Sequence, residues 1–562
     1  MPSGSSRRHF LRSPKIDHGV GRGGLFRGAR RAESEPSTRR NSLAALALLA
    51  FAIPVVTIGG GCNFGESGIA PPANRIFLPA GVAADNRSQV LYVVNSNSDL
   101  RFNAGTVVAV DLDQVNAVRE AALAAATCAR DSSLPECQGQ TLQNPLPCTK
   151  TRFSRTEAVP DNYCCWDLVD SNILNCNEPQ FIHSEATVAI GSFGGAVQLQ
   201  QPDDGTDFRR LFVAVRAEPS ITFADVIIQG DASALGGKSV AMRCQGPRSE
   251  AWTQQPLGYC DDNWKVRRPG GATPGALVLP EEPHSMRLDP TRGALFVGHL
   301  TVLANNLVQG GGVSSIDVCD HQNVRFAGHT DATFIPQSLS QSVASLSPGD
   351  PANLSNIVYA GAQSSAAISG LALQSPQKNC ADVAAGDPDR DLTLVAAESF
   401  YSSAFLPHGS DIRGILFSED GSEAWILHKN DATIATSPAA LVAIDRRRTG
   451  LNGEPANTPI DFVQVCGGPT EMQMHGVGQD QRIFITCYDT GQIYVVDPIH
   501  MTVTAIIDAG AGPTNLVFLP TDPTKAYVAS FFNSHLSAID LAPGRTENHV
   551  VLRIGLPHGY GQ

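Results

Sequence analysis

Short apolar runs recur seven times along the chain, each with one aromatic side chain among aliphatic ones. Aromatic and β-branched residues fit the pleated surface of a sheet, so each run predicts a β-strand. The seven runs are Leu91–Asn95, Leu211–Val215, Leu295–His299, Ile357–Gly361, Ala424–His428, Ile483–Cys487 and Ala526–Ser530.

The neighbours of these runs repeat as well. A second apolar strand follows most of them and often ends in Asp, and a third leads through a Gly/Pro turn into the next unit; Thr502–Ile507 followed by Gly510–Phe518 shows this transition. Four strands per unit is the pattern of a propeller blade. The sequence therefore predicts an all-β, seven-bladed β-propeller over residues 75–555. The last strand, His549–Ile554, would complete the seventh blade in order, so we expect ring closure by packing between blades.

Unequal spacing of the runs indicates insertions near the start. The first two runs begin 120 positions apart and the last two only 43 apart, close to a bare blade of about 40–50 residues. We expect disulfide-rich loop insertions in the first two blades, at about 114–182 and 229–272. The first would lie between the third and fourth strands of its blade, and the second at the equivalent place.

Two hairpins carry a family resemblance. Phe417–Ile426 reads F-S-E-D-G-S-E-A-W-I, and Phe518–Val528 is a second version of the same strand–turn–strand segment. These units resemble the YVTN-type propeller repeat of bacterial cell-envelope and surface-layer proteins, most closely after residue 405. The resemblance implies the fold and says little about function, because this repeat serves varied roles.

An export signal is expected before the propeller. Arg39 and Arg40 precede the 13-residue apolar stretch Ala44–Val56, which suits a signal peptide better than a membrane span. Cys62 follows Gly59-Gly60-Gly61 and resembles a lipobox cysteine, although Gly59 replaces the usual aliphatic residue. We therefore expect a leader at 1–61, lipidation of Cys62, a tether at 62–74 and a C-terminal tail at 556–562.

Other export routes remain open. A plain cleaved signal peptide and an uncleaved anchor are alternatives to lipidation. Ser6–Arg12 resembles a twin-arginine motif, but polar and Gly-rich residues follow it. The lipoprotein hypothesis predicts an outer-membrane protein facing the periplasm or the surface, and the alternative is a secreted protein.

Composition supports a folded, exported body. Apolar residues make up 42% and charged residues 17%, enough for a packed core. Ten basic and three acidic residues lie in the first 41 positions, which leaves 31 basic and 51 acidic residues beyond them. Nucleic acid is a poor partner for such a body, because phosphate binding needs a basic surface. We expect a monomer.

Twelve of the 13 cysteines remain if Cys62 carries a lipid, and an even number permits six disulfides in an oxidising compartment. No CxxC or CxxCH occurs, so zinc ribbons and c-type haem attachment are not indicated. Adjacent Cys164 and Cys165 are expected to have different partners, and Cys466 and Cys487 flank one hairpin region as a plausible pair. The candidate disulfide cysteines are Cys128, Cys137, Cys148, Cys164, Cys165, Cys176, Cys244, Cys260, Cys319, Cys380, Cys466 and Cys487.

Three histidines occur in similar contexts at what look like blade openings: His284, His408 and His475. The family resemblance implies that the start of the innermost strand lies near the channel mouth, where imidazoles could bind a transition metal ion. The alternative is that these side chains cap strand ends. No GxSxG motif or other catalytic residue is evident.

Two functions follow. The first is a non-catalytic binding or scaffold module of the cell envelope, joined to the membrane by its lipid, with a protein or glycan ligand. The second is a propeller enzyme, a lactonase-like hydrolase or a metal-dependent oxidoreductase, with its site at the central channel. No cofactor is identified beyond the candidate channel metal ion.

Overall fold

The computed structural model describes most of the chain from Gly68 to Leu556. The described residues are 68–85, 87–138, 143–149, 159–201, 207–230, 238–246, 258–267, 279–290, 292–304, 307–330, 343–347, 357–363, 365–374, 380, 391–402, 411–429, 439–447, 455–519, 521–544 and 546–556.

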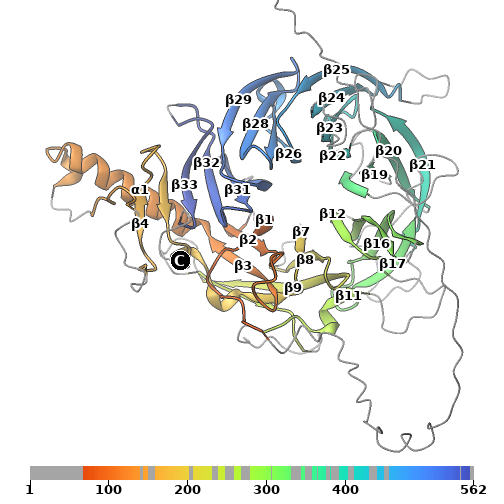
Figure 1. The fold of residues 1–562 in the computed structure, drawn as a ribbon, viewed down its shortest axis with the longest axis horizontal. Helices are drawn as coiled ribbons and strands as arrows, with labels where there is room; N and C mark the ends of the chain where they lie inside the picture. The colour runs from red at the N-terminus through yellow and green to blue at the C-terminus, as the bar shows by residue number, and fades with distance from the viewer. Residues whose placement is uncertain are drawn as a thin grey trace, which may run out of the picture. The chain divides into compact units, whose positions relative to one another are not determined.

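Seven antiparallel sheets surround a central channel, which confirms the predicted seven-bladed propeller (Figure 1). Blades 1 to 3 are β1 (Pro79–Asp85), β2 (Val90–Asn95), β3 (Gly105–Asp111) and β6 (Val188–Ile190); β7 (Gly194–Gln200), β8 (Arg209–Val215), β9 (Ser220–Gln229), β10 (Ser239–Arg243) and β11 (Lys265–Arg267); and β12 (Pro283–Asp289), β13 (Ala294–His299), β16 (Val313–Asp317) and β17 (Arg325–Thr330). Blades 4 and 5 are β18 (Val343–Ser347), β19 (Ile357–Ala362), β20 (Ala367–Leu373) and β21 (Leu394–Tyr401); and β22 (Asp411–Phe417), β23 (Glu423–Lys429), β24 (Ala440–Asp445) and β25 (Thr458–Gln464). Blades 6 and 7 are β26 (Pro469–His475), β27 (Arg482–Cys487), β28 (Gln492–Asp497) and β29 (Thr502–Asp508); and β30 (Pro513–Leu519), β31 (Asp522–Ser530), β32 (His535–Asp540) and β33 (His549–Ile554).

The seven aromatic runs form the second strand of every blade. Their side chains are buried on both faces, against the blades before and after, and Tyr92, Tyr359 and Tyr527 have no exposed surface. A strand buried on both faces is apolar at nearly every position. This burial explains why the second strands give the clearest signal in the sequence.

Every innermost strand has an irregular register near its start. One extra residue stands between the first two paired positions of β12, β26 and β30, namely His284, Thr470 and Thr514. In β22 the extra residue, Arg413, follows the second paired position. The strands β1, β7 and β18 have a comparable shift. A β-bulge changes the direction of the extra side chain. Thr470 and Thr514 use it to donate hydrogen bonds to the carbonyls of Pro513 and Pro79 in the next blade, at 3.1 and 3.2 Å.

The first insertion lies between β3 and β6. It contains the helix α1 (Leu112–Arg130), whose first turn is capped by the side chain of Asp111, and the short strands β4 (Cys164–Trp166) and β5 (Leu174–Cys176). β5 pairs in parallel with β33, so two strands inserted in blade 1 extend the outer edge of blade 7. We call this pair, β4 and β5, the clasp.

Ring closure thus has two components. The four strands of blade 7 follow one another in order, and β1 packs against β30, as expected from the sequence. The clasp is an addition that the sequence did not predict. Further contacts beside it join the two blades, because Arg553 of β33 donates to Asp167 at 3.2 Å and Lys525 donates to Asn116 of α1 at 3.0 Å.

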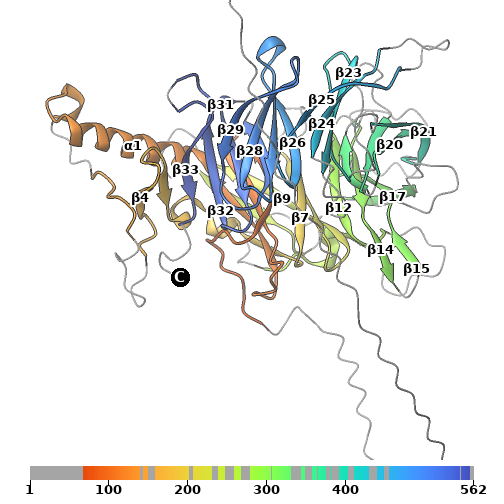
Figure 2. The same cartoon turned by 45° about the horizontal axis from the view of Figure 1, so that its top comes forward.

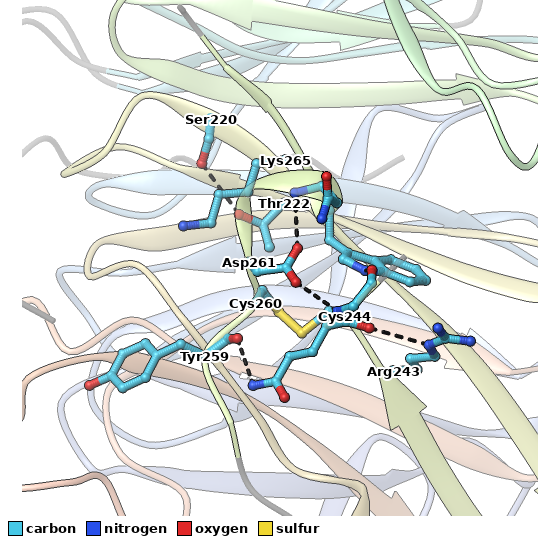
Figure 3. Close-up of a disulfide and its surroundings, with 12 residues drawn as sticks. Ser220, Thr222, Arg243, Cys244, Tyr259, Cys260, Asp261 and Lys265 are labelled. Atoms are coloured by element: carbon cyan, nitrogen blue, oxygen red, sulfur yellow. Dashed lines mark hydrogen bonds between the residues drawn. A yellow bond between two sulfur atoms is a disulfide. The ribbon is translucent and has the colours of Figure 1, made fainter. Parts of the chain in front are cut away.

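The second predicted insertion contains part of the blade itself. Both β10 and β11 lie within 229–272 and pair with β9, which is ten residues long and offers an edge for two short strands. The disulfide Cys244–Cys260 joins the end of β10 to the segment before β11, and Asp261 beside it accepts a hydrogen bond from the Gly246 N–H at 2.7 Å (Figure 3). Blade 3 carries another insertion between β13 and β16, the hairpin β14 (Thr301–Ala304) and β15 (Leu307–Gly310), which is labelled in Figure 2.

Six disulfides are present. They are Cys128–Cys137, Cys148–Cys165, Cys164–Cys176, Cys244–Cys260, Cys319–Cys380 and Cys466–Cys487. The expected Cys466–Cys487 pair and the separate partners of Cys164 and Cys165 are confirmed. Six disulfides indicate an oxidising compartment and therefore export. Within the described ranges, no helix combines the length and apolar character needed to cross a membrane.

Candidate functional site

A cavity of about 850 Å³ occupies the centre of the ring. Each of the seven innermost strands contributes to its wall, together with residues that follow the second strands, such as Arg216, Tyr488 and Phe531. Apolar side chains make up much of the wall: Val82, Val197, Met286, Ile415, Met472 and Val517. Polar side chains contribute about as much of the wall as apolar ones, and strands of all seven blades hold them in place.

Three arginines from different blades line this cavity. Arg216 is paired with Glu282, and Arg413 is paired with Asp411 on its own strand. Arg287 of β12 is partly exposed and has neither a hydrogen bond nor an ion pair from its guanidinium to any described residue. Burial lowers the pKa of Arg287, and the negative charge of Glu471 on β26 opposes that shift.

His284, the bulged residue of β12, lies on the same wall. Burial, followed by the nearby charges of Arg413 and Arg216, lowers the pKa of His284 to about 3. The imidazole is therefore neutral near pH 7. The two arginines beside it are each paired with a carboxylate, so the charges around His284 largely balance.

Glu471 on the β26 wall is held by three donors. Gln473 donates to one carboxylate oxygen at 2.8 Å, and the other accepts from the side chain of Asn515 at 2.5 Å and from the Leu516 N–H at 3.2 Å. Burial raises the pKa of Glu471, while these hydrogen bonds and the charge of Arg287 act in the opposite direction. Glu471 is thus fixed in place by blades 6 and 7.

Three aromatic side chains lie at the end of the cavity where the innermost strands begin. Tyr488 and Phe531 line it, and Phe532 packs on both, with ring centroids 5.1 and 5.4 Å away. Phe532 is 54% exposed. Aromatic faces at this end suit the apolar or planar part of a ligand.

The candidate metal ligands do not share one place. His284 lies at the second position of β12, whereas His475 is the last residue of β26 and stacks on Phe518 with centroids 4.4 Å apart. The interpretation that His475 opens a blade is wrong, because Pro469 begins that strand. His408 and Cys62 lie outside the described residues. No cluster of three or more His, Cys, Asp or Glu side chains suited to a metal ion occurs among the residues that the structure describes.

Sequence reasoning missed the arginines. Arg287 is the fifth residue of P-H-S-M-R-L-D, where the equivalent strands P-T-E-M-Q-M-H and P-T-N-L-V-F-L have Gln473 and Val517. Aligning the strands on their opening proline would have shown a charged residue at a position that faces the channel.

Comparison with known proteins adds no functional information. No family model matches the chain, and no curated protein gives a significant match. The YVTN-type resemblance therefore stays a prediction. Among solved structures, Kuenenia stuttgartiensis hydrazine synthase is 11% identical with a TM-score of 0.44, over 85% of this chain and 99% of that chain. Dihydro-heme d1 dehydrogenase NirN in complex with DHE is 11% identical with a TM-score of 0.38, over 66% of this chain and 58% of that chain.

Proposed function

We propose that this protein is a non-catalytic binding module of the cell envelope, tethered by a lipid on Cys62, that takes a small molecule into its central cavity. The observation that supports it is the cavity of about 850 Å³, whose mixed polar and apolar wall comes from the strands of all seven blades. This volume lies within the range of about 300–1,000 Å³ that is typical of small-molecule sites. The hydrogen bonds that fix Glu471 and Asn515 keep one wall in a single arrangement.

Native mass spectrometry of the full chain, purified from its own membranes, tests ligand binding. We expect the native protein to be heavier than its chain by the mass of one bound small molecule, and we expect unfolding to release that molecule. A matched variant, Val517→Trp, enlarges a partly buried side chain of the cavity wall and should abolish the adduct while the six disulfides still form. Retention of the adduct would place the ligand elsewhere. If the wild type instead contains a stoichiometric metal ion that the same variant lacks, the result would favour the alternative, a metal-dependent propeller enzyme.

Mass spectrometry of the mature amino terminus tests the anchor. We expect a diacylglyceryl group on Cys62, and we expect Cys62→Ser to move the protein from the membrane fraction to the soluble fraction. An unmodified Cys62 in the mature chain would overturn the anchor and favour secretion, without affecting the cavity proposal.

A further inference from the structure

Arg287 has a position that the fold alone does not explain. Its side chain is partly exposed, lines the cavity and has no hydrogen bond or ion pair to a described residue. A partly buried cation usually contacts a carboxylate, and the other two cavity arginines do so, with Glu282 and Asp411 as partners. The charge of Glu471 acts on Arg287 without a direct contact. The guanidinium of Arg287 therefore keeps its hydrogen-bond donors available to a ligand in the cavity.

We propose that Arg287 binds the carboxylate of a small organic acid in the central cavity, with the apolar part of the acid against the leucine and valine side chains of the wall. This inference rests on the proposed binding function and specifies its ligand. The planar fork of a guanidinium matches a carboxylate with two parallel hydrogen bonds.

The charges around the cavity favour a single negative charge on the ligand. Arg216 and Arg413 are largely neutralised by their acidic partners, so Arg287 is the one cavity arginine left to balance a ligand among the described residues. Glu471, whose electrostatic interaction reaches Arg287, would repel a second negative charge. A monocarboxylate therefore suits this cavity better than a phosphate dianion.

The side chains of the wall define the rest of the ligand. Leu199, Leu416 and Val517 line the cavity and are only partly buried, so they offer apolar surface, and Tyr488 and Phe531 offer aromatic faces. Aromatic side chains pack well on planar groups. An aromatic or branched aliphatic acid therefore fits this surface.

The test measures binding of benzoate, benzamide and benzamidine to the full chain by isothermal titration calorimetry. These three probes share a ring and differ in charge. We expect benzoate to bind and the other two to bind at least about tenfold more weakly. Arg287→Met should weaken benzoate by roughly ten- to a hundredfold. Arg287→Lys, which keeps the charge but loses the fork, should have an intermediate affinity. Arg447→Met, a change at an exposed arginine on the outer part of blade 5, serves as the matched control.

The outcomes separate this inference from the proposed function. Equal binding of benzamide and benzoate, or benzoate binding that Arg287→Met leaves unchanged, would overturn the carboxylate site but leave a binding cavity. Binding of inorganic phosphate with no binding of benzoate would also overturn it.

Thermal unfolding with and without benzoate supplies the second readout. A ligand-binding role predicts that benzoate raises the melting temperature of the wild type and leaves that of Arg287→Met unchanged, because only the wild type holds the carboxylate. An equal rise in both proteins would show that binding does not depend on Arg287 and would overturn the proposal.

Discussion

Asn515 of β30 donates a hydrogen bond to Glu471 of β26 at 2.5 Å, and its carbonyl oxygen accepts one from the Val82 N–H of β1 at 2.7 Å. One side chain therefore joins blades 6, 7 and 1 beside the channel, at the place where the ends of the ring meet. The bulged threonines of β26 and β30 add two hydrogen bonds along the same line.

Replacing Asn515 should weaken the ring. Asn515→Ala leaves the buried carboxylate of Glu471 without one donor and the Val82 N–H without its acceptor, so we expect a loss of about 2–3 kcal/mol in the free energy of unfolding. Urea denaturation followed by tryptophan fluorescence measures it. Asn263→Ala, at an exposed position, is the control, and an equal loss in both variants would contradict the role of Asn515.

The buried ion pair between blades 1 and 2 supports a second prediction. The carboxylate of Asp85 accepts from Arg209 Nε at 2.6 Å, and both side chains are buried, with 0% and 5% exposure. Asp85→Asn leaves the arginine charge uncompensated, which costs about 3–5 kcal/mol. The same denaturation experiment measures the loss. Asp445→Asn, whose partner Arg447 is exposed, should change stability little. Similar values for the two variants would show that burial of the pair is unimportant.

The sequence revealed the blades because their second strands are buried on both faces. Tyr92, Phe212 and Tyr527 lie between adjacent blades, so each run is apolar at nearly every position and stands out from its surroundings. The innermost strands gave a weaker signal. Their side chains meet the channel as well as the neighbouring blades, so Arg287 appears in the sequence as one polar position in an alternating strand.

The clasp and the histidines could not be read correctly from local patterns. β5 is three residues long and pairs with Leu552, Arg553 and Ile554, far away in the sequence, so no local periodicity indicates the pair. His475 is the last residue of the strand that begins at Pro469, whereas His284 is the second residue of its strand. Placing the two histidines at equivalent positions therefore misaligned the two strands by five residues.

Loss of the clasp disulfide should destabilise the ring more than loss of a comparable disulfide elsewhere. Cys164–Cys176 and Cys128–Cys137 span 12 and 9 residues, so their loop-closure contributions agree within about 0.3 kcal/mol. Only the first links β4 to β5, which pairs with β33. We expect the double alanine variant of Cys164 and Cys176 to lose about 1–2 kcal/mol more than that of Cys128 and Cys137.

Denaturant unfolding compares the two double variants, and hydrogen exchange of Leu552 and Ile554 shows whether the outer edge of blade 7 has opened. Equal stability losses with unchanged exchange at β33 would mean that the clasp contributes nothing to ring closure.

Stability should fall in acid through Asp111, which caps α1 and contacts two other segments. Burial raises its pKa, but the hydrogen bond to His183, the Lys238 charge and the Gln114 N–H together hold that pKa below the ordinary value. A carboxyl group whose pKa is lower in the folded state stabilises the protein above its unfolded-state pKa, near 4, and loses this effect as the pH falls through the folded-state pKa.

Asp111→Asn should therefore destabilise the protein at pH 7, and the difference from the wild type should shrink as the pH approaches 3. Taking the difference at each pH isolates Asp111 from Glu471 and Asp411, whose pKa values are raised by burial and which act with the opposite sign. Urea denaturation at pH 7, 5 and 3.5 measures the trend, with exposed Asp461→Asn as the control. A difference that stays constant across this range would show that ionisation of Asp111 contributes no stability.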